Sequence, residues 1–110
     1  MARKPTIPNE VRTEVERIVV EFNSKNLAKR GAGYSVRFRG NYTYVDRGEY
    51  GSPSPICRLT YNGAMDNWGF AIYKYSNESY DPEEWFFPGA GEVDGTVEGA
   101  MRAGLMAYPI

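Results

Sequence analysis

Apolar residues recur at helical intervals near the start of the chain. Residues 9–28 place one apolar stripe along a helix, and its members are Val11, Val15, Ile18, Val19 and Phe22. The charged residues of this stretch fall on the other sides of the helix, with Glu21 and Lys25 in the stabilising i to i+4 order. The pattern predicts an amphipathic N-terminal helix, with Pro8 in its first turn and Gly31 beyond its end.

Two alternating runs of apolar and polar residues, 34–39 and 42–46, flank Gly40 and Asn41. This dipeptide suits a two-residue primed turn, so the two runs should form an antiparallel hairpin. The turn sets the expected pairs, which are Arg39 with Tyr42, Phe38 with Thr43, Arg37 with Tyr44 and Val36 with Val45. One face of the hairpin then holds Tyr34, Val36, Phe38, Thr43 and Val45, and the other holds Arg37, Arg39, Tyr42 and Tyr44.

A second hairpin is expected farther along the chain. Residues 46–55 have a loop composition, and their prolines bar a strand before Ile56. With residues 62–67 as the hairpin loop, the expected pairs are Tyr61 with Trp68, Leu59 with Phe70 and Cys57 with Ile72. The opposite face collects Ile56, Arg58, Thr60, Ala71, Tyr73 and Tyr75. A tight turn at Asn62 and Gly63 is an alternative that would shift this register.

The C-terminal part of the chain predicts a second helix. Residues 80–88 suit neither regular structure along their whole length, although residues 84–87 are an alternative for a short fifth strand. Asp94 then offers an N-cap. The apolar side of the following helix would consist of Val97, Ala100, Met101, Gly104, Leu105 and Tyr108. Its glycines and alanines leave little bulk, so we expect this helix to lie close on the sheet and to be held by packing.

Together these elements predict an α+β fold with the order α-β-β-β-β-α. The sheet would be an antiparallel meander of four strands, or of five with residues 84–87, with both helices on its apolar face. Because no linker or internal repeat divides the chain, residues 1–110 should form a single domain, with residues 1–7 flexible. Fourteen of the sixteen aromatic residues lie between Tyr34 and Phe87, which makes aromatic rings the expected core material.

The composition narrows the classes of function. The chain has no histidine, which removes the commonest general base and metal ligand, and no nucleophile motif replaces it. The one cysteine, Cys57, lies in a strand-like run and should be a buried, inert thiol. We therefore expect a non-enzymatic protein without a cofactor or a metal site. No apolar run of signal-peptide or membrane-spanning length follows the basic N-terminus, so a cytoplasmic location is expected.

Charge is unevenly distributed along the chain. Residues 1–40 carry nine Lys and Arg against four Asp and Glu, whereas residues 41–110 carry four against ten. Residues 78–98 contain seven acids and no base, so this stretch should repel a polyanion. The acids nearest to a cation-binding pattern are Asp81, Glu83, Glu84, Glu92 and Asp94. Their spacing does not match a calcium loop, which favours a solvated acidic edge.

The polar faces of the two hairpins form the main candidate site. Its expected members are Arg37, Arg39, Tyr42, Tyr44, Arg58, Tyr73 and Tyr75. Tyrosine and arginine are enriched in protein interfaces, and the same groups stack on bases and bind phosphates. Cross-strand Arg and Tyr pairs also cover exposed sheets that bind nothing. Our hypothesis is an interaction domain for a protein partner or a second copy of itself, with single-stranded nucleic acid as the alternative and no membrane contact.

A second candidate is the aromatic run Trp85, Phe86 and Phe87. Exposed rings at these positions would anchor a partner protein. Rings of this size are more often buried, so core filling is the competing interpretation. The sequence also leaves open whether the acidic stretch 78–98 folds over the Arg and Tyr side chains.

Overall fold

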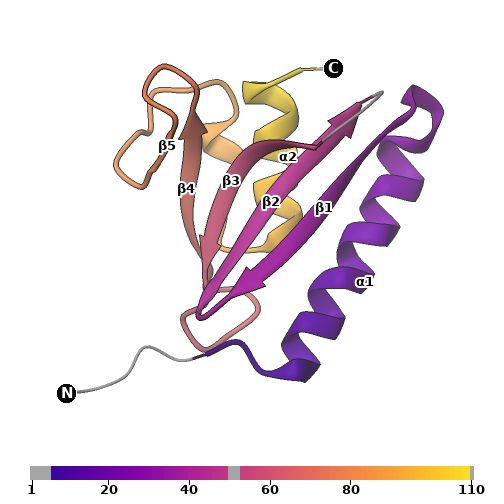
Figure 1. Ribbon diagram of the computed structural model, residues 1–110, viewed down its shortest axis with the longest axis vertical. Helices are drawn as coiled ribbons and strands as arrows, with labels where there is room; N and C mark the ends of the chain where they lie inside the picture. The colour runs from indigo at the N-terminus through magenta and orange to yellow at the C-terminus, as the bar shows by residue number, and fades with distance from the viewer. Residues whose placement is uncertain (1–5, 50–52, 110) are drawn as a thin grey trace.

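The computed structural model describes residues 6–49 and 53–109. Within them the chain forms two α-helices, two short 3₁₀ turns and five strands (Figure 1). In chain order these elements are α1 (Asn9–Asn26), η1 (Ala28–Arg30), β1 (Ala32–Arg39), β2 (Tyr42–Glu49), β3 (Ser54–Thr60), β4 (Gly69–Lys74), β5 (Ser79–Asp81), η2 (Ala90–Glu92) and α2 (Val97–Ala107). Most of the N-terminal segment expected to be flexible lies outside the described residues, but Ile7 at its end is 3% exposed and belongs to the core.

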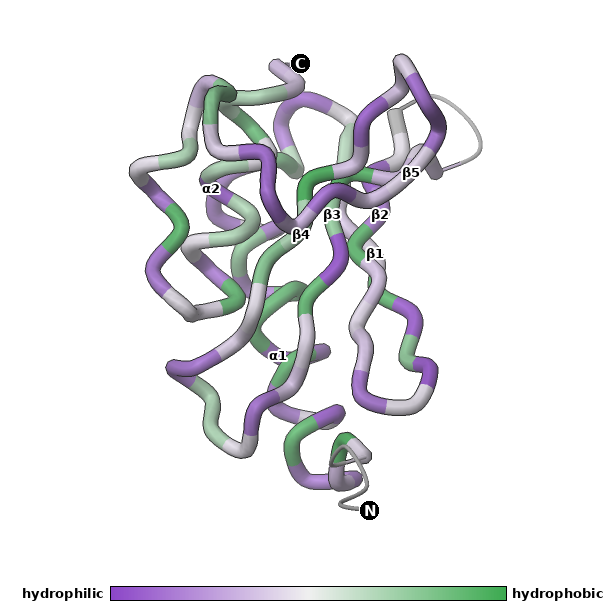
Figure 2. The backbone as a smooth tube through the Cα atoms, turned by 90° about the vertical axis from the view of Figure 1, so that its left-hand side faces the viewer, coloured by the Kyte–Doolittle hydropathy of each residue, from purple (hydrophilic) through white to green (hydrophobic). Residues whose placement is uncertain are grey.

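The strands form one sheet in the order β1-β2-β3-β4-β5, and each pair of neighbours is antiparallel. The predicted α+β meander with a helix at either end is thus confirmed. Side chains from both helices and from the inward positions of the strands share one hydrophobic core. Figure 1 shows α2 behind β2 and β3 and α1 alongside β1. Figure 2 shows α2 on one side of the strands and the alternating hydropathy along them.

Both hairpins have the predicted register. Arg39 pairs with Tyr42 and Arg37 with Tyr44 across β1 and β2, and Gly40 in the turn has the positive φ of 61° that a primed turn requires. Across β3 and β4, Leu59 pairs with Phe70. The alternative tight turn after Tyr61 is therefore not formed. Local turn chemistry and alternation are sufficient to fix both pairings, because a slip by one residue would turn the apolar side chains outward.

The predicted loop at 46–55 is shorter than expected. β2 continues to Glu49 and β3 begins at Ser54, while the predicted loop positions 50–52 lie outside the described residues. Proline is accommodated within β3 because the register shifts between Val45 and Asp46, so that Asp46 pairs with Pro55. This bulge also corrects the expected position of Ile56. Its side chain is 2% exposed and packs on the helix side, against Gly104 of α2.

Two further predictions were wrong in position. The fifth strand is β5 at residues 79–81, whereas residues 84–87 form no strand because the Glu84 carboxylate accepts the backbone N–H of Phe86 at 2.8 Å and turns the chain. The N-cap of α2 is Thr96, whose hydroxyl accepts the Gly99 N–H at 3.0 Å. Asp94 supports this cap from two residues upstream, since its Oδ1 accepts the Thr96 N–H at 3.0 Å.

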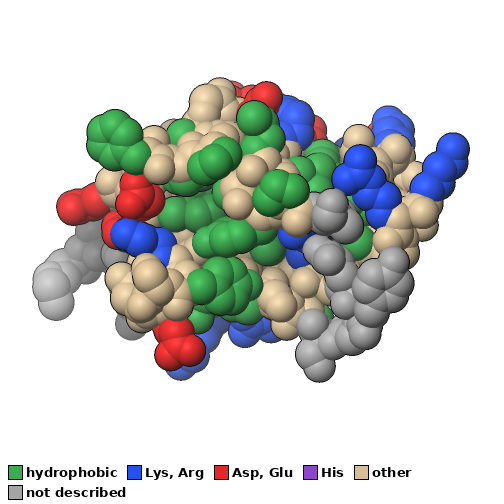
Figure 3. All heavy atoms as spheres, turned by 90° about the horizontal axis from the view of Figure 1, so that it is seen from above, with side chains coloured by type: hydrophobic (Ala, Val, Ile, Leu, Met, Phe, Trp, Pro, Cys, Tyr) green, Lys and Arg blue, Asp and Glu red, His purple; other side chains and the backbone are tan. Residues whose placement is uncertain are grey.

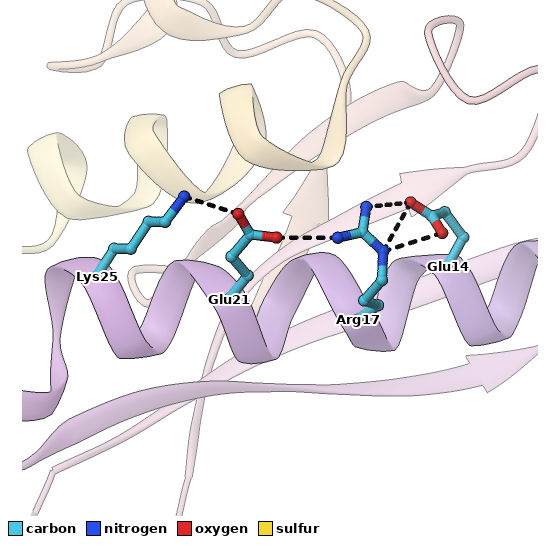
Figure 4. A network of polar contacts seen from close by, with 4 residues as sticks. All are labelled: Glu14, Arg17, Glu21 and Lys25. Carbon is cyan, nitrogen blue, oxygen red and sulfur yellow. Dashed lines mark hydrogen bonds and ion pairs between the residues drawn. The ribbon is translucent and has the colours of Figure 1, made fainter.

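The apolar stripe of α1 faces the core, with Val15, Val19 and Phe22 buried. Pro8 is the N-cap of this helix and precedes its first turn. The solvent side carries the ion-pair chain Glu14–Arg17–Glu21–Lys25 (Figure 4). Hydrogen bonding to Arg17 lowers the pKa of Glu14, and hydrogen bonding to Lys25 lowers that of Glu21. All four side chains are well exposed, so this face is the solvated surface that the sequence predicted.

The helix α2 lies very close to the sheet because it presents glycine there. A Cβ atom at Gly104 would stand 2.6 Å from the Tyr34 hydroxyl oxygen and 2.7 Å from Cγ2 of Ile56. Tyr34 donates this hydroxyl to the Met101 carbonyl at 2.8 Å. The buried guanidinium of Arg47 donates to the carbonyls of Gly104 and Tyr108 at the end of the helix. The Gly104 carbonyl also accepts the Tyr108 N–H at 2.9 Å, so Arg47 adds a second donor there and gives the Tyr108 carbonyl, beyond the last helical residue, a partner of its own.

Within the described residues, neither helix combines the length and the apolar character needed to cross a bilayer.

Candidate functional site

The outer face of the sheet, opposite the helices, carries a continuous group of arginine and tyrosine side chains from all five strands. We call this group the Arg/Tyr face, and it consists of Arg37, Arg39, Tyr42, Tyr44, Arg58, Tyr73 and Tyr80. The alternation of side chains along each strand explains why these side chains share one face. Neighbouring strands place outward-pointing residues opposite one another; Tyr44, for example, lies opposite Arg37 on β1 and Arg58 on β3.

The tyrosine rings of this face touch one another across the sheet. Ring centroids are 6.1 Å apart for Tyr42 and Tyr44, 5.5 Å for Tyr44 and Tyr80, and 5.0 Å for Tyr80 and Tyr73. The pairs of Tyr80 with Tyr44 and with Tyr73 have the edge-to-face arrangement that aromatic quadrupoles favour, and the rings of Tyr42 and Tyr44 are tilted by 57°. Tyr44 and Tyr80 meet across two intervening strands because β4 presents only Ala71 there, and that alanine is 3% exposed beneath its neighbours.

The arginines of the face have three different environments. The Arg58 guanidinium carbon lies 4.4 Å from the Tyr42 ring centroid and 5.5 Å from that of Tyr80, and its Nε is buried without a hydrogen-bond partner. Arg37 lies over Tyr44 and donates to Asp46 at 2.9 Å, an interaction that raises the pKa of Arg37. Arg39 is exposed near the hairpin turn.

Tyr75 was expected on this face but belongs only to its margin. It follows the end of β4, and its hydroxyl donates to the Pro55 carbonyl at 2.8 Å. Its ring contacts Tyr73 at 4.9 Å on one side and Tyr108 at 5.3 Å on the other. Tyr75 therefore connects the Arg/Tyr face with the C-terminal end of α2.

Sequence reasoning missed Tyr80, a member of the Arg/Tyr face, and Asp46, the ion-pair partner of Arg37. Asp46 could have been found from the first hairpin, because it follows Tyr42 and Tyr44 in the same alternation. Tyr80 could not, since its run was assigned to a segment without regular structure and only the pairing of Tyr80 with Tyr73 brings it to the face.

Burial affects the titratable groups on and beneath the sheet. Burial raises the pKa of the Tyr80 hydroxyl above its ordinary value of 10.0. Cys57 is fully buried on the helix side, and burial raises the pKa of its thiol, as expected for an inert cysteine. Across residues 6–49 and 53–109, no group of three or more acidic or cysteine side chains converges as metal ligands would.

The acidic stretch 78–98 does not fold over the Arg/Tyr face. It contributes Tyr80 through β5 and then passes to the helix side, where Phe87 stacks on Phe70 with a centroid distance of 5.8 Å and Gly89 meets α2. Many of its acids pair within their own neighbourhood, as Glu92 and Asp94 do with Arg102. The outer face is thus left open by this segment.

The three residues of the aromatic run 85–87 differ in how far their side chains are buried. Phe87 fills the core edge against Phe70. The ring centroid of Trp85 lies 6.2 Å from that of Phe70, although Trp85 is 47% exposed. Phe86 is 100% exposed. Core filling thus describes Phe87, while Phe86 contributes nothing to the core.

Comparisons with protein-family models, curated proteins and solved structures found no match for this chain. The surface chemistry of the fold therefore carries the inference of function.

Proposed function

We propose that this protein is a non-enzymatic interaction domain whose Arg/Tyr face binds a protein partner. The observation that supports this proposal is the contact chain of Tyr42, Tyr44, Tyr80 and Tyr73 on a sheet face that both helices leave uncovered. These rings form an amphipathic surface, because each packs against its neighbours and carries a polar hydroxyl group on an apolar ring. A binding partner would meet a surface that is already organised, which lowers the entropy lost on association.

The charge of the face favours protein over nucleic acid. Arg37 is already paired with Asp46, and in the described part of the chain no carboxylate forms an ion pair with Arg39 or Arg58. These two arginines, on a chain of net charge −1, attract a polyanion only weakly. The binding of a nucleic acid depends strongly on how many of its phosphates the protein neutralises. Tyrosine and arginine with few other charges match the core of a protein interface. The proposal counts a second copy of this chain among the protein partners.

Single-stranded nucleic acid is the second candidate, and Arg58 is the observation that favours it. Its guanidinium lies on two tyrosine rings within a five-stranded sheet, an arrangement on which an unpaired base could stack. The inclined ring pairs argue against it, because each tyrosine edge already meets the plane of a neighbour and leaves less free ring surface. For both candidates the proposal keeps the cytoplasmic location expected from the sequence.

Site-specific photo-crosslinking in living cells tests the proposal directly. A benzophenone amino acid would replace Arg39, which is exposed on the face, and in a matched control it would replace Val20, which is 68% exposed on α1. A protein adduct formed from position 39 and absent from position 20 is the expected result. Mass spectrometry of the adduct then identifies the partner, including a second copy of the chain.

Other outcomes overturn the proposal. Adducts of equal yield from both positions, or none from position 39, would mean that the face binds no protein. A nuclease-sensitive adduct would favour the nucleic-acid candidate. That result would be checked by an amide NMR titration with a single-stranded oligonucleotide, in which shifts at Tyr44 and Arg58 should weaken as salt is raised.

A further inference from the structure

The exposed apolar side chains gather around one segment of the molecule. Five large hydrophobic side chains are exposed among the described residues. Four of them lie close to residues 85–89 or directly after β4, and these are Tyr75, Trp85, Phe86 and Met106. Exposure of 100% for Phe86 is the extreme case, because it leaves a whole aromatic ring in water. Clustering of this kind marks a contact surface, whereas a single exposed side chain needs no explanation.

Two of these side chains, Tyr75 and Phe86, line a groove of about 300 Å³ between the end of β4, residues 84–88 and the C-terminus of α2. Trp85 is next to a third lining residue, since its ring centroid lies 6.4 Å from that of Phe87. Its apolar lining includes Ile72, Tyr75, Phe87 and Tyr108, and Phe86 lies at its border. We call it the aromatic groove. Figure 3 shows this end of the molecule, with hydrophobic side chains gathered in its middle and acidic side chains to one side.

The charged residues that line the aromatic groove are Lys74 and Glu84, and acids outnumber bases in the adjoining residues 78–84. Lys74 forms ion pairs with Asp81 at 3.7 Å and with Glu84 at 3.2 Å, so its charge is more than offset. Glu83 and Glu78 are exposed on the same stretch of chain. An apolar groove with an acidic border is complementary to a segment that carries apolar side chains between basic ones.

We propose that the aromatic groove binds an amphipathic segment of a partner protein, in which apolar anchors are flanked by lysine or arginine. This surface is distinct from the Arg/Tyr face and rests on different observations. The partner's apolar side chain enters the groove beside Phe86, and its basic residues face Glu83 and Glu84.

A second copy of the chain fits this groove less well than a basic partner does. Two copies related by a two-fold axis would bring the same surface together, so Glu78, Glu83 and Glu84 of one copy would approach those of the other. Like charges placed opposite each other oppose association. The acidic border therefore selects against self-pairing at this site.

The test uses short model peptides and the natural tryptophans. One peptide has leucine at helical i, i+3, i+4 and i+7 positions with lysine elsewhere, a second has glutamate in place of lysine, and a third has lysine with serine in place of leucine. Acrylamide quenching reports on Trp85, because Trp85 is 47% exposed and Trp68 is 5% exposed. Phe86→Ser is the test variant, whose fold is preserved because Phe86 makes no core contact, and Val20→Ser is its matched control.

We expect the leucine and lysine peptide to bind and to shield Trp85, with affinity that falls as salt is raised. Phe86→Ser should weaken this binding by about tenfold or more, the size typical of an aromatic anchor, and Val20→Ser should not. Equal binding of the glutamate peptide, equal binding of the serine peptide, or full binding by Phe86→Ser would overturn the proposal. A doubled mass in sedimentation that Phe86→Ser abolishes would show that a second copy occupies the groove, which also overturns it.

Discussion

Replacing Gly104 with alanine tests the closeness of α2 to the sheet. Gly104 lies in the interior of α2, where alanine is intrinsically the better helix former. The added methyl group would stand 2.6 Å from the Tyr34 hydroxyl oxygen and 2.7 Å from Cγ2 of the buried Ile56. These distances are too short for ordinary contact, so either the helix or both neighbours have to move.

The magnitudes favour destabilisation. Helix propensity contributes a gain of about 1 kcal/mol for Gly→Ala. Overpacking a closely packed site costs about 1–3 kcal/mol. Moving Tyr34 also weakens its 2.8 Å bond to the Met101 carbonyl, at a further cost of about 1 kcal/mol. The expected net loss in the free energy of unfolding is about 1–3 kcal/mol, or a fall in Tm of about 4 °C for each kcal/mol in a domain of this size.

Urea denaturation of wild type, Gly104→Ala and Gly91→Ala measures this effect. Gly91 is the matched control, because it lacks a positive φ and a Cβ there would meet nothing within 4 Å. Its replacement should leave stability unchanged or raise it by about 0.5 kcal/mol. In a Tyr34→Phe background the cost of Gly104→Ala should shrink, because the closest clashing atom is absent. If Gly104→Ala proves as stable as wild type, the close packing of α2 is not what selects glycine.

Three further predictions concern Tyr34, the α2 cap and the aromatic run. Burial raises the pKa of the Tyr34 hydroxyl from its ordinary value of 10.0 to about 12. The contribution of Tyr34 to stability is therefore complete below pH 10 and is lost as the pH rises through 12. Urea titrations should show this loss in the wild type, whereas Tyr34→Phe should lack it. Thr96→Ala should cost about 1 kcal/mol in thermal unfolding because the cap to Gly99 is lost, and Thr96→Ser should restore it. Phe87→Ser should cost more than about 2 kcal/mol, whereas Phe86→Ser should change stability by less than about 0.5 kcal/mol; equal effects would contradict the observed division of the run.

The hairpins are predictable because their determinants are local. Gly40 and Asn41 select the turn, and strict alternation on both sides allows one register that keeps Val36 and Val45 together in the core. The same local pattern is enough to assign Arg37, Tyr44 and Arg58 to the outward face of the sheet. The residues of a site on regular strands can therefore be predicted from the same local pattern.

The predictions that failed concern features that depend on long-range partners. Ile56 was assigned to the outer face because alternation was counted from Cys57, and a bulge adds a residue that periodicity does not reveal. β5 forms because Tyr80 finds Tyr73 on β4, although its own sequence has little strand character. Asp94 was predicted as the cap of α2 on its propensity, but Thr96 has a similar propensity, and the position of the first helical N–H groups selects it.

The composition of the Arg/Tyr face also limits what can cover it. A helix of the same chain would have to be apolar to bury the rings, and it would then remove the Arg58 charge from water without offering an acceptor. Asp46 is only 8% exposed and is satisfied by Arg37, so this pair tolerates burial, but Arg58 and Arg39 do not unless oxygen atoms are supplied. The protein partner proposed for this face would therefore have to combine apolar contact with the tyrosines and carbonyl or carboxylate oxygens opposite the two arginines, which is the chemistry of a folded protein surface with a polar rim.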